Sequence, residues 1–375
     1  MPARLAVPTE TLSGERRVAL DPGTAARFKK LGVQLYIQQG AGRSAYFPDE
    51  DYAAHGELVA EASTLLGNAQ VILKIQPPTV DEVGMMPEGA VVASLMQGHR
   101  HPEMVKALCE RRITSFAMEL IPRISRAQSM DVLSSQAAVA GYKVVLMAAD
   151  IAPMFFPMLT TAAGTIRPAK VVVVGAGVAG LQAISTAKRL GAQVEAYDIR
   201  PAAREQVESL GAKMIDTGVS AEGEGGYARE LTADEKKQQA EVLARHVAAA
   251  HVLITTAAIP GREAPKIITR AMLEAMKPGC VVVDLAAETG GNCELTEAGK
   301  TLEHQGVIIH GPTNIASTIP VHASEMYARN FLNFFSPMIQ DGELRLDWDD
   351  EVIAKSALTH EGSIRHEPTR RAVGG

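Results

Sequence analysis

Three glycines with the spacing GxGxxG stand directly after a run of four valines. Gly175, Gly177 and Gly180 follow residues 171–174 and open a segment with apolar residues at helical spacing. This arrangement predicts a buried strand, a tight turn and a helix whose first N–H groups can bind the pyrophosphate of a dinucleotide. Gly175 would permit the turn, Gly177 would let the backbone approach the phosphates, and Gly180 would let the helix pack closely on the strand.

An acidic residue closes the next predicted strand. Asp198 follows the strand at 193–197 and lies 18 residues after Gly180. A carboxylate at this position accepts hydrogen bonds from ribose hydroxyls and repels a 2′-phosphate, so it favours NAD(H) over NADP(H). Arg200 complicates this choice, because an arginine just past the strand can accommodate a 2′-phosphate. A glycine-rich turn beside a surface aspartate is the alternative that involves no ligand.

A third segment, residues 122–136, is dense in hydrogen-bonding side chains. It precedes a long predicted helix, so we expect it to face a cleft between two domains. The amide of Gln128 offers the donor and the acceptor that a nicotinamide carboxamide needs, and Arg123 could pair with Asp131 to shape the loop. The alternative is a hinge in which a serine such as Ser134 caps the helix and the ion pair contributes little.

Short β-branched runs alternate with helical patterns along most of the chain. This alternation predicts an α/β protein with two Rossmann-like domains and mostly parallel sheets. The first domain has predicted strands at 5–7, 35–37, 71–73, 91–93 and 115–118. The second has predicted strands at 171–174, 193–197, 213–215, 252–255, 281–283 and 307–309. Six strands with helices between them make a complete doubly wound nucleotide-binding fold.

Two helices are predicted to connect the domains. A long helix over 134–151 joins them, and a helix over 322–334 returns the chain to the first domain. We therefore place an N-terminal domain at 1–134 plus 312–375 and an NAD-binding domain at 135–311. From residue 341 the chain is charged and irregular, which predicts a frayed tail over 365–375 without an assigned role. The Gly- and Glu-rich stretch 217–239 interrupts the second sheet, and its composition fits a lid or a disordered connector equally.

Composition excludes several classes of protein. Lys plus Arg number 37 and Asp plus Glu number 43, so the net charge of −6 makes nucleic acid a poor partner. The three cysteines form no CxxC pair, which favours a reducing compartment. We see no run of about 20 apolar residues that could span a bilayer. His99 and His101 have no evident third ligand, so no metal is expected.

The run RISRAQSMD at 123–131 resembles the NAD(H)-binding first domain of the proton-translocating nicotinamide nucleotide transhydrogenases, within the alanine dehydrogenase/transhydrogenase superfamily. GAGVAG at 175–180, GGYARE at 225–230, the TTA-IPG pattern at 255–261 and the DLA-E-GGN pattern at 284–292 agree with this resemblance. The likeness covers about residues 3–340. In that family this component is often a separate chain, the soluble first portion of the α subunit.

The resemblance implies roles at matching positions. The loop at the nicotinamide end would comprise Arg123, Ile124, Ser125, Gln128, Asp131 and Ser134, with Gln128, Arg123, Asp131 and Ser134 as the set that serves catalysis. The pyrophosphate turn would include Ala176, Gly177 and Val178, and the ribose end Asp198, Ile199 and Arg200. A closing loop would carry Gly226 and Tyr227, with Gln239 just beyond it and Ala258 after the fourth strand. The stretch 217–239 would then be a lid.

The implied activity is that of an NAD(P)⁺ transhydrogenase of the Si-specific/Re-specific, proton-translocating type. NADH on this chain would reduce NADP⁺ on a β-subunit domain, and a membrane domain would couple that step to proton movement. Hydride transfer between nicotinamides needs alignment and exclusion of water rather than a general base. The resemblance also implies a homodimer, in the cytoplasm and peripheral to the inner membrane through its partner subunits.

Two other functions remain open. Alanine dehydrogenase shares the N-terminal pattern ERRVAL at 15–20, and Lys74 lies where that family has a substrate lysine. That family also needs a histidine, and an ungapped alignment puts Gln97 there, with His99 and His101 nearby. Glutamine cannot remove a proton from an amine. A regulatory module that senses NAD is the second alternative, since the chain would bind NADH without its NADP partner.

Overall fold

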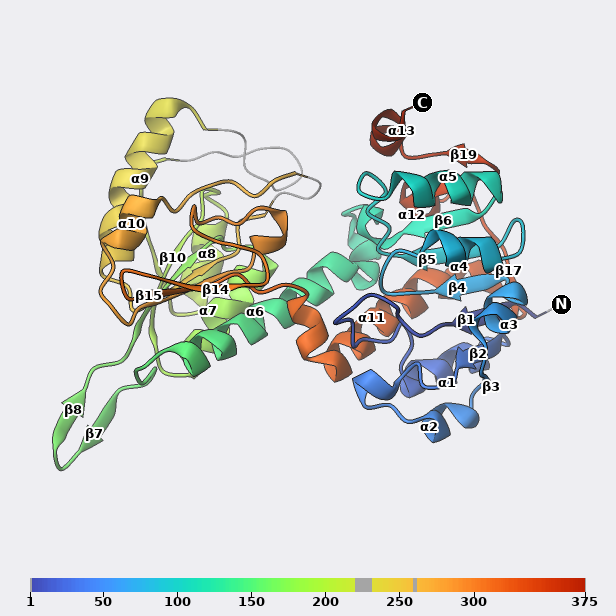
Figure 1. The fold of residues 1–375 in the computed structure, drawn as a ribbon, viewed down its shortest axis with the longest axis horizontal. Coiled ribbons are helices and arrows are strands. Elements are labelled where there is room, and N and C mark those ends of the chain that lie inside the picture. The colour runs from blue at the N-terminus through green and yellow to red at the C-terminus, as the bar shows by residue number, and fades with distance from the viewer. Residues whose placement is uncertain (1, 220–230, 259–261, 375) are drawn as a thin grey trace. The chain divides into compact units, whose positions relative to one another are not determined.

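The computed structural model describes residues 2–219, 231–258 and 262–374 (Figure 1). The chain forms two compact units: unit 1 comprises Met1–Gln136 and Ser317–Gly375, and unit 2 comprises Ala137–Ala316. The boundaries expected from the sequence lie close to these positions. Both units are built on mostly parallel sheets covered by helices, which confirms the predicted α/β class.

Unit 1 is built on an eight-stranded sheet with the order β19-β18-β6-β5-β4-β1-β2-β3. Its parallel strands are β1 (Arg4–Val7), β2 (Gln34–Gln38), β3 (Glu57–Val59), β4 (Val71–Leu73), β5 (Val91–Ser94) and β6 (Thr114–Ala117). The five predicted strands are all present. The sequence missed β3, because its three residues are exposed or half-buried and show no apolar run.

The helices of unit 1 are mostly short and capped by the residues that precede them. They are α1 (Pro22–Lys30), α2 (Asp49–Ala53), α3 (Ala62–Gly67), α4 (Val80–Met85), α5 (Pro102–Glu110) and α11 (Pro320–Phe335). Asp21 caps α1, and Thr79 forms a capping box with Glu82 at α4. The helix α11 returns the chain to unit 1 as predicted and buries Tyr327 and Phe331 completely in the core.

The C-terminal segment is ordered, so the predicted frayed tail is wrong. It forms the two-stranded pair β16 (Ile339–Gln340) and β17 (Glu343–Leu344), then α12 (Glu351–Ser356), β18 (Ala357–His360), β19 (Ser363–Ile364) and α13 (Glu367–Val373). The strand β18 pairs antiparallel with β6 and covers the edge that β6 would otherwise expose. Thr359 is fully buried there and bonds Ser115. Such short elements leave no periodicity that a sequence pattern could reveal.

Unit 2 is built on a seven-stranded sheet with the order β11-β10-β9-β12-β13-β15-β14. Its strands are β9 (Lys170–Val174), β10 (Gln193–Tyr197), β11 (Lys213–Met214), β12 (Val252–Thr255), β13 (Val281–Asp284), β14 (Thr301–His304) and β15 (Val307–His310). The six predicted strands are parallel and follow the doubly wound order 3-2-1-4-5-6. Among the described strands of this sheet only β14 is antiparallel, and the sequence missed it because all four residues are exposed or half-buried.

Helices cover both faces of the unit 2 sheet. They are α7 (Val178–Arg189), α8 (Ala203–Ser209), α9 (Ala233–Ala248) and α10 (Arg270–Glu274). Val171 and Val173 join one apolar core, and Val172 and Val174 join the other, so the valine strand is buried on both faces as predicted. A hairpin of β7 (Leu159–Thr161) and β8 (Gly164–Ile166) projects from unit 2 (Figure 1).

The helix α6 (Val132–Ile151) carries the chain from unit 1 into unit 2. Among the described residues it is the one helix long and apolar enough to cross a membrane by length and composition, contrary to the expectation from the sequence. Core helices share these properties, and Val144, Val145 and Ala148 of α6 are fully buried in the core of unit 2. A Cβ at Gly141 would lie 2.2 Å from the Ala179 carbonyl oxygen, so α6 packs tightly against α7.

Candidate functional site

The glycine-rich turn joins β9 to α7 in unit 2. Gly175 has a φ of +98°, which favours glycine, and a Cβ at Gly180 would lie 1.8 Å from the Gly175 carbonyl oxygen. Gly177 precedes α7, and a Cβ there would meet nothing within 4 Å. The turn is therefore closed by Gly180 and open at Gly177. The N–H groups of the first turn of α7, which have no acceptors within the helix, fit a bound pyrophosphate.

Polar side chains from two neighbouring strand ends support this turn. The Thr256 hydroxyl, after β12, donates to the Gly175 carbonyl at 2.9 Å. Asn292, after β13, is fully buried and forms two hydrogen bonds with the backbone of Ala257, of 3.0 and 2.7 Å. The sequence indicated these segments but did not single out Thr256 or Asn292. Ala258, a predicted cofactor contact, is exposed beside this support.

Asp198 lies at the carboxyl end of β10, where both of its carboxylate oxygens are bonded. The Ala176 N–H donates to Oδ2 at 2.7 Å, and the Arg200 guanidinium donates to Oδ1 at 2.9 Å and to Oδ2 at 2.8 Å. Burial raises the pKa of Asp198, but the hydrogen bonds from Arg200 and Ala176 outweigh it and hold the pKa below its usual range. The residue is therefore a carboxylate at neutral pH, as ribose recognition requires.

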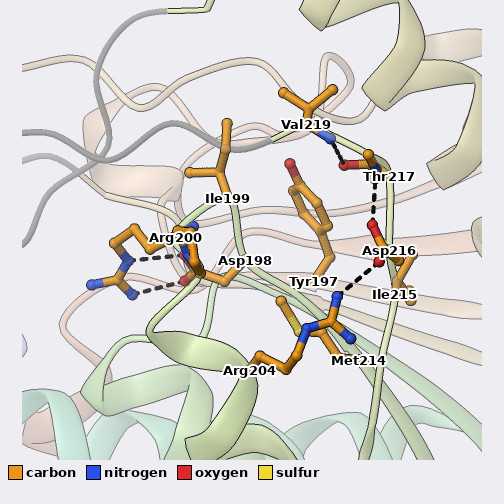
Figure 2. Close-up of a pocket in the computed structure, with 12 residues that line it drawn as sticks. Tyr197, Asp198, Ile199, Arg200, Arg204, Met214, Ile215, Asp216, Thr217 and Val219 are labelled. Carbon is orange, nitrogen blue, oxygen red and sulfur yellow. Dashed lines mark hydrogen bonds and ion pairs between the residues drawn. The ribbon is translucent and has the colours of Figure 1, made fainter.

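A pocket of about 280 Å³ opens beside Asp198 (Figure 2). It is lined by residues 197–201, Arg204 and residues 214–219, from the ends of β10 and β11. Ile199, Met214 and Ile215 supply apolar surface, and Asp198 supplies the acceptor. Flat apolar surface beside a carboxylate suits an adenine base joined to a ribose. The sequence indicated Asp198, Ile199 and Arg200 but not the β11 side of the pocket.

Gln239 supports this pocket from behind. Its amide donates a 2.7 Å hydrogen bond to the Tyr197 hydroxyl, and its side chain is buried. In Figure 2 the Tyr197 ring lies between Ile199 and Thr217. Gln239 thus joins α9 to the pocket wall and is not presented to a ligand. The other two residues predicted for the closing loop, Gly226 and Tyr227, lie outside the described residues.

The segment predicted to hold the nicotinamide belongs to unit 1 and forms the 3₁₀ helix η3 (Ser125–Met130). Ala127 and Met130 enter the core, with 1% and 8% exposure, while Ser125 and Gln128 face outward. The three-residue period of a 3₁₀ helix produces this division, because residues i and i+3 share a face. Before η3, Arg123 is exposed and Ile124 packs partly against the core.

Asp131 caps the N-terminus of α6. Its carboxylate accepts hydrogen bonds from the Ser134 N–H at 2.9 Å and from the Ser134 hydroxyl at 2.6 Å. The expected ion pair between Arg123 and Asp131 is not formed, and the cap is Asp131 rather than Ser134. The N–H groups that a helix start leaves unpaired attract the acidic side chain more strongly than an exposed arginine does. The result is a fixed junction between η3 and α6.

The carboxyl ends of β1 and β4 in unit 1 hold a buried charge cluster. The Lys74 ammonium is fully buried, 2.8 Å from Glu82 Oε1 and 3.6 Å from Glu10 Oε2. Arg17 is buried beside Glu15 at 2.6 Å. These cations are neutralised within the protein, so they do not form the open cationic site that a substrate carboxylate would need.

The histidine position of the alanine dehydrogenase alternative is no better suited to proton transfer. Gln97 has a φ of +44°, and its backbone N–H donates to the carboxylate of Glu119 at 2.6 Å. His99 and His101 are exposed, and no group of three or more His, Cys, Asp or Glu side chains in the described part of the chain could hold a metal ion.

Both halves of the chain match known family descriptions. Residues 6–140 match the N-terminal domain, and residues 144–367 the C-terminal domain, of alanine dehydrogenase/PNT.

The chain is highly similar to transhydrogenases along nearly its whole length. It is 44% identical to the first portion of NAD(P) transhydrogenase subunit alpha of Rhodospirillum rubrum, over 97% of this chain and 98% of that one. The solved structure of a transhydrogenase from Sinorhizobium meliloti matches with a TM-score of 0.88 and 45% identity, over 96% of this chain and 99% of that one. The alanine dehydrogenase of Methanococcus maripaludis is more distant, with 26% identity over 98% of this chain and 96% of that one.

Proposed function

The chain belongs to the alanine dehydrogenase/PNT family, and we propose that it is the NAD(H)-binding α-subunit component of an NAD(P) transhydrogenase. The observation that carries this proposal is the exposed Gln128 on a segment fixed by the Asp131 cap. The described residues of this segment offer hydrogen bonds but no group suited to act as a general base. Such a site can orient a nicotinamide ring, and hydride transfer between two such rings requires orientation without proton removal.

The residues of unit 2 fit the rest of the cofactor. The open turn at Gly177 would hold the pyrophosphate, Asp198 the ribose, and the pocket beside it the adenine. Gln128, Arg123, Asp131 and Ser134 of unit 1 would hold or shape the nicotinamide end. NAD(H) supplies the hydride when it is bound. The protein supplies alignment, a carboxylate that disfavours a 2′-phosphate, and a surface from which water is excluded.

Two partners complete the proposed assembly. NADP(H) is held by a β-subunit domain rather than by this chain, and a membrane-spanning domain couples hydride transfer to proton translocation. The R. rubrum relative is named as one portion of an alpha subunit, which supports an assembly of several subunits. We further propose a homodimer, Si-specific/Re-specific stereochemistry, and a cytoplasmic location peripheral to the inner membrane.

Reconstitution tests this function. The chain is mixed with the purified NADP(H)-binding domain of an R. rubrum-type β subunit, and hydride transfer from NADH to NADP⁺ is followed by stopped flow. We expect transfer only when both proteins are present. NADH binding by the chain without any transfer would instead support an NAD-sensing module. NADH oxidation by the chain alone that depends on pyruvate and ammonia would support an alanine dehydrogenase.

A further inference from the structure

The segment that presents Gln128 is held in place by residues far along the chain. The η3 helix is only six residues long, and a short 3₁₀ helix has little stability of its own. Ala127 and Met130 anchor one face in the core, but an apolar contact alone does not fix how the opposite face is oriented. The orientation of Gln128 therefore depends on polar contacts made by its neighbours in the segment.

One set of contacts comes from α11. Asn330 and Asn333 lie three residues apart on this helix, and their amide groups donate to the same acceptor, the Ser129 carbonyl, at 2.9 and 3.0 Å. The Asn330 Oδ1 also accepts a 2.7 Å hydrogen bond from the Ser135 hydroxyl in the first turn of α6. Asn330 is buried and uses both ends of its amide, so it joins η3 to the start of α6 in a single geometry.

The second contact comes from the start of α12. Asp350 accepts two hydrogen bonds from the Arg126 guanidinium, from Nη1 at 2.9 Å and from Nη2 at 2.5 Å. The same carboxylate caps α12 by accepting from the Val352 N–H at 2.7 Å. A two-point contact fixes the guanidinium plane, whereas a single exposed ion pair would leave it free to rotate. Asp350 is thereby tied to a helix and to η3 at once.

We propose that Asn330, Asn333 and Asp350 are positioning residues for hydride transfer, because they hold the backbone on both sides of Gln128. This inference rests on the proposed function, in which Gln128 orients the nicotinamide. No hydrogen bond of the Gln128 side chain is found among the described residues, which leaves its amide available to a ligand. The C-terminal segment of unit 1 therefore serves the site, although no pattern in its sequence assigns it a role.

A positioning role and a purely structural role predict different kinetics. Loss of a stabilising contact lowers the melting temperature and the fraction of folded protein, but the folded molecules transfer hydride at the normal rate. Loss of positioning slows the transfer step itself in molecules that still bind NADH. A displacement of about 1 Å can cost about a hundredfold in rate, so small shifts of η3 are measurable.

The test uses the full chain with the NADP(H)-binding partner domain. Asp350→Asn keeps an N-cap for α12 but loses the charged two-point contact, and Asn333→Ala removes one of the two donors to Ser129. Glu351→Gln is the matched control, since Glu351 lies next to Asp350 but pairs with Lys355 on the surface of α12. Asn330 is left intact, because its loss would strand the buried Ser135 hydroxyl.

We expect single-turnover hydride transfer to fall about threefold to tenfold in Asp350→Asn and Asn333→Ala, and further in the double variant, with the NADH Kd within about twofold of wild type. Glu351→Gln should match wild type. Unchanged transfer in the double variant, or a loss explained entirely by weaker NADH binding, would overturn the proposal.

Hydrogen exchange provides a readout that does not need the partner. The amides of residues 123–131 should exchange faster in Asp350→Asn and Asn333→Ala than in Glu351→Gln, and protection equal to wild type would also overturn the proposal. If the wild-type chain transfers no hydride, it is the proposed function that fails. The exchange rates then decide separately whether these residues hold the segment.

Discussion

The guanidinium of Arg200 bonds both carboxylate oxygens of Asp198, at 2.9 Å from Nε to Oδ1 and at 2.8 Å from Nη2 to Oδ2. The two residues that favour opposite cofactors in the sequence thus form one unit in the structure. A ribose that bonds Asp198 must share the carboxylate with Arg200. Because the arginine charge is balanced by the carboxylate, it is a weaker attraction for a 2′-phosphate than an unpaired arginine would be.

Asp198→Ala should therefore weaken NADH binding and relax the discrimination against NADPH. Loss of a hydrogen bond to a charged acceptor corresponds to about a tenfold rise in the NADH Kd. The variant also releases Arg200 to attract the 2′-phosphate, so the gap between NADH and NADPH should narrow. Isothermal titration with both nucleotides measures this. Asp216→Ala, which alters another acid lining the same pocket, is the control and should leave the ratio of affinities unchanged.

The glycine-rich turn allows a paired test of structure against binding. Gly180→Ala places a Cβ against the Gly175 carbonyl and should lower the free energy of unfolding by about 3 kcal/mol. Gly177→Ala meets no neighbour and has an ordinary φ of −76°, so stability should change by less than about 1 kcal/mol. The added methyl should nevertheless raise the NADH Kd at least about tenfold, because it occupies space needed by the phosphates. Equal NADH affinity in Gly177→Ala and wild type would refute the assignment of this turn.

Gln128→Asn should separate binding from chemistry. The shorter side chain withdraws the amide by one methylene, so single-turnover hydride transfer in the reconstituted complex should slow by about tenfold to a hundredfold. The NADH Kd should stay within about threefold, since most contacts to the nucleotide lie in unit 2. A transfer rate equal to wild type would remove Gln128 from the proposed role.

Acid titration should report the buried carboxylates of unit 1 with opposite signs. Burial raises the pKa of Glu15, but the bonds from Arg17 and Gln76 outweigh it and lower the pKa to about 2, from 4.5 when free. The stability that Glu15 contributes is therefore complete above about pH 4.5 and is lost as the pH falls through about 2. Glu15→Gln should cost on the order of 3 kcal/mol at neutral pH, and that cost should shrink on acidification.

Glu119 provides the control for this titration. Burial raises its pKa above 4.5, despite backbone hydrogen bonds that lower it, so this group favours the folded state more as the pH falls through the raised value. Relative to wild type, Glu119→Gln should therefore lose stability on acidification, whereas Glu15→Gln should recover it. Urea unfolding of both variants from neutral pH down to about pH 3 measures the two trends. Parallel curves for the two variants would contradict this electrostatic description of unit 1.

The sequence was sufficient for the sheet of unit 2 and for the glycine-rich turn. Each depends on short-range patterns: an apolar run marks a strand buried on both faces, and glycine spacing marks the turn. The same reasoning failed for β3, β14 and the C-terminal strands, which are short and partly exposed. It also misplaced the helix cap at Asp131, because several polar residues in that segment could have served and their spacing does not rank them.

Local pattern alone thus determined the two α/β sheets, the dinucleotide turn and Asp198, since the residues involved are close in the chain or share a strand period. Only the tertiary structure decided which groups neutralise Lys74 and which hold the segment around Gln128. Asp350 contacts Arg126 across 224 residues and Asn330 contacts Ser129 across 201, and no spacing rule connects positions so far apart. Those contacts exist because packing of α11 and α12 in unit 1 brings them together, and this packing is a property of the whole core rather than of any segment.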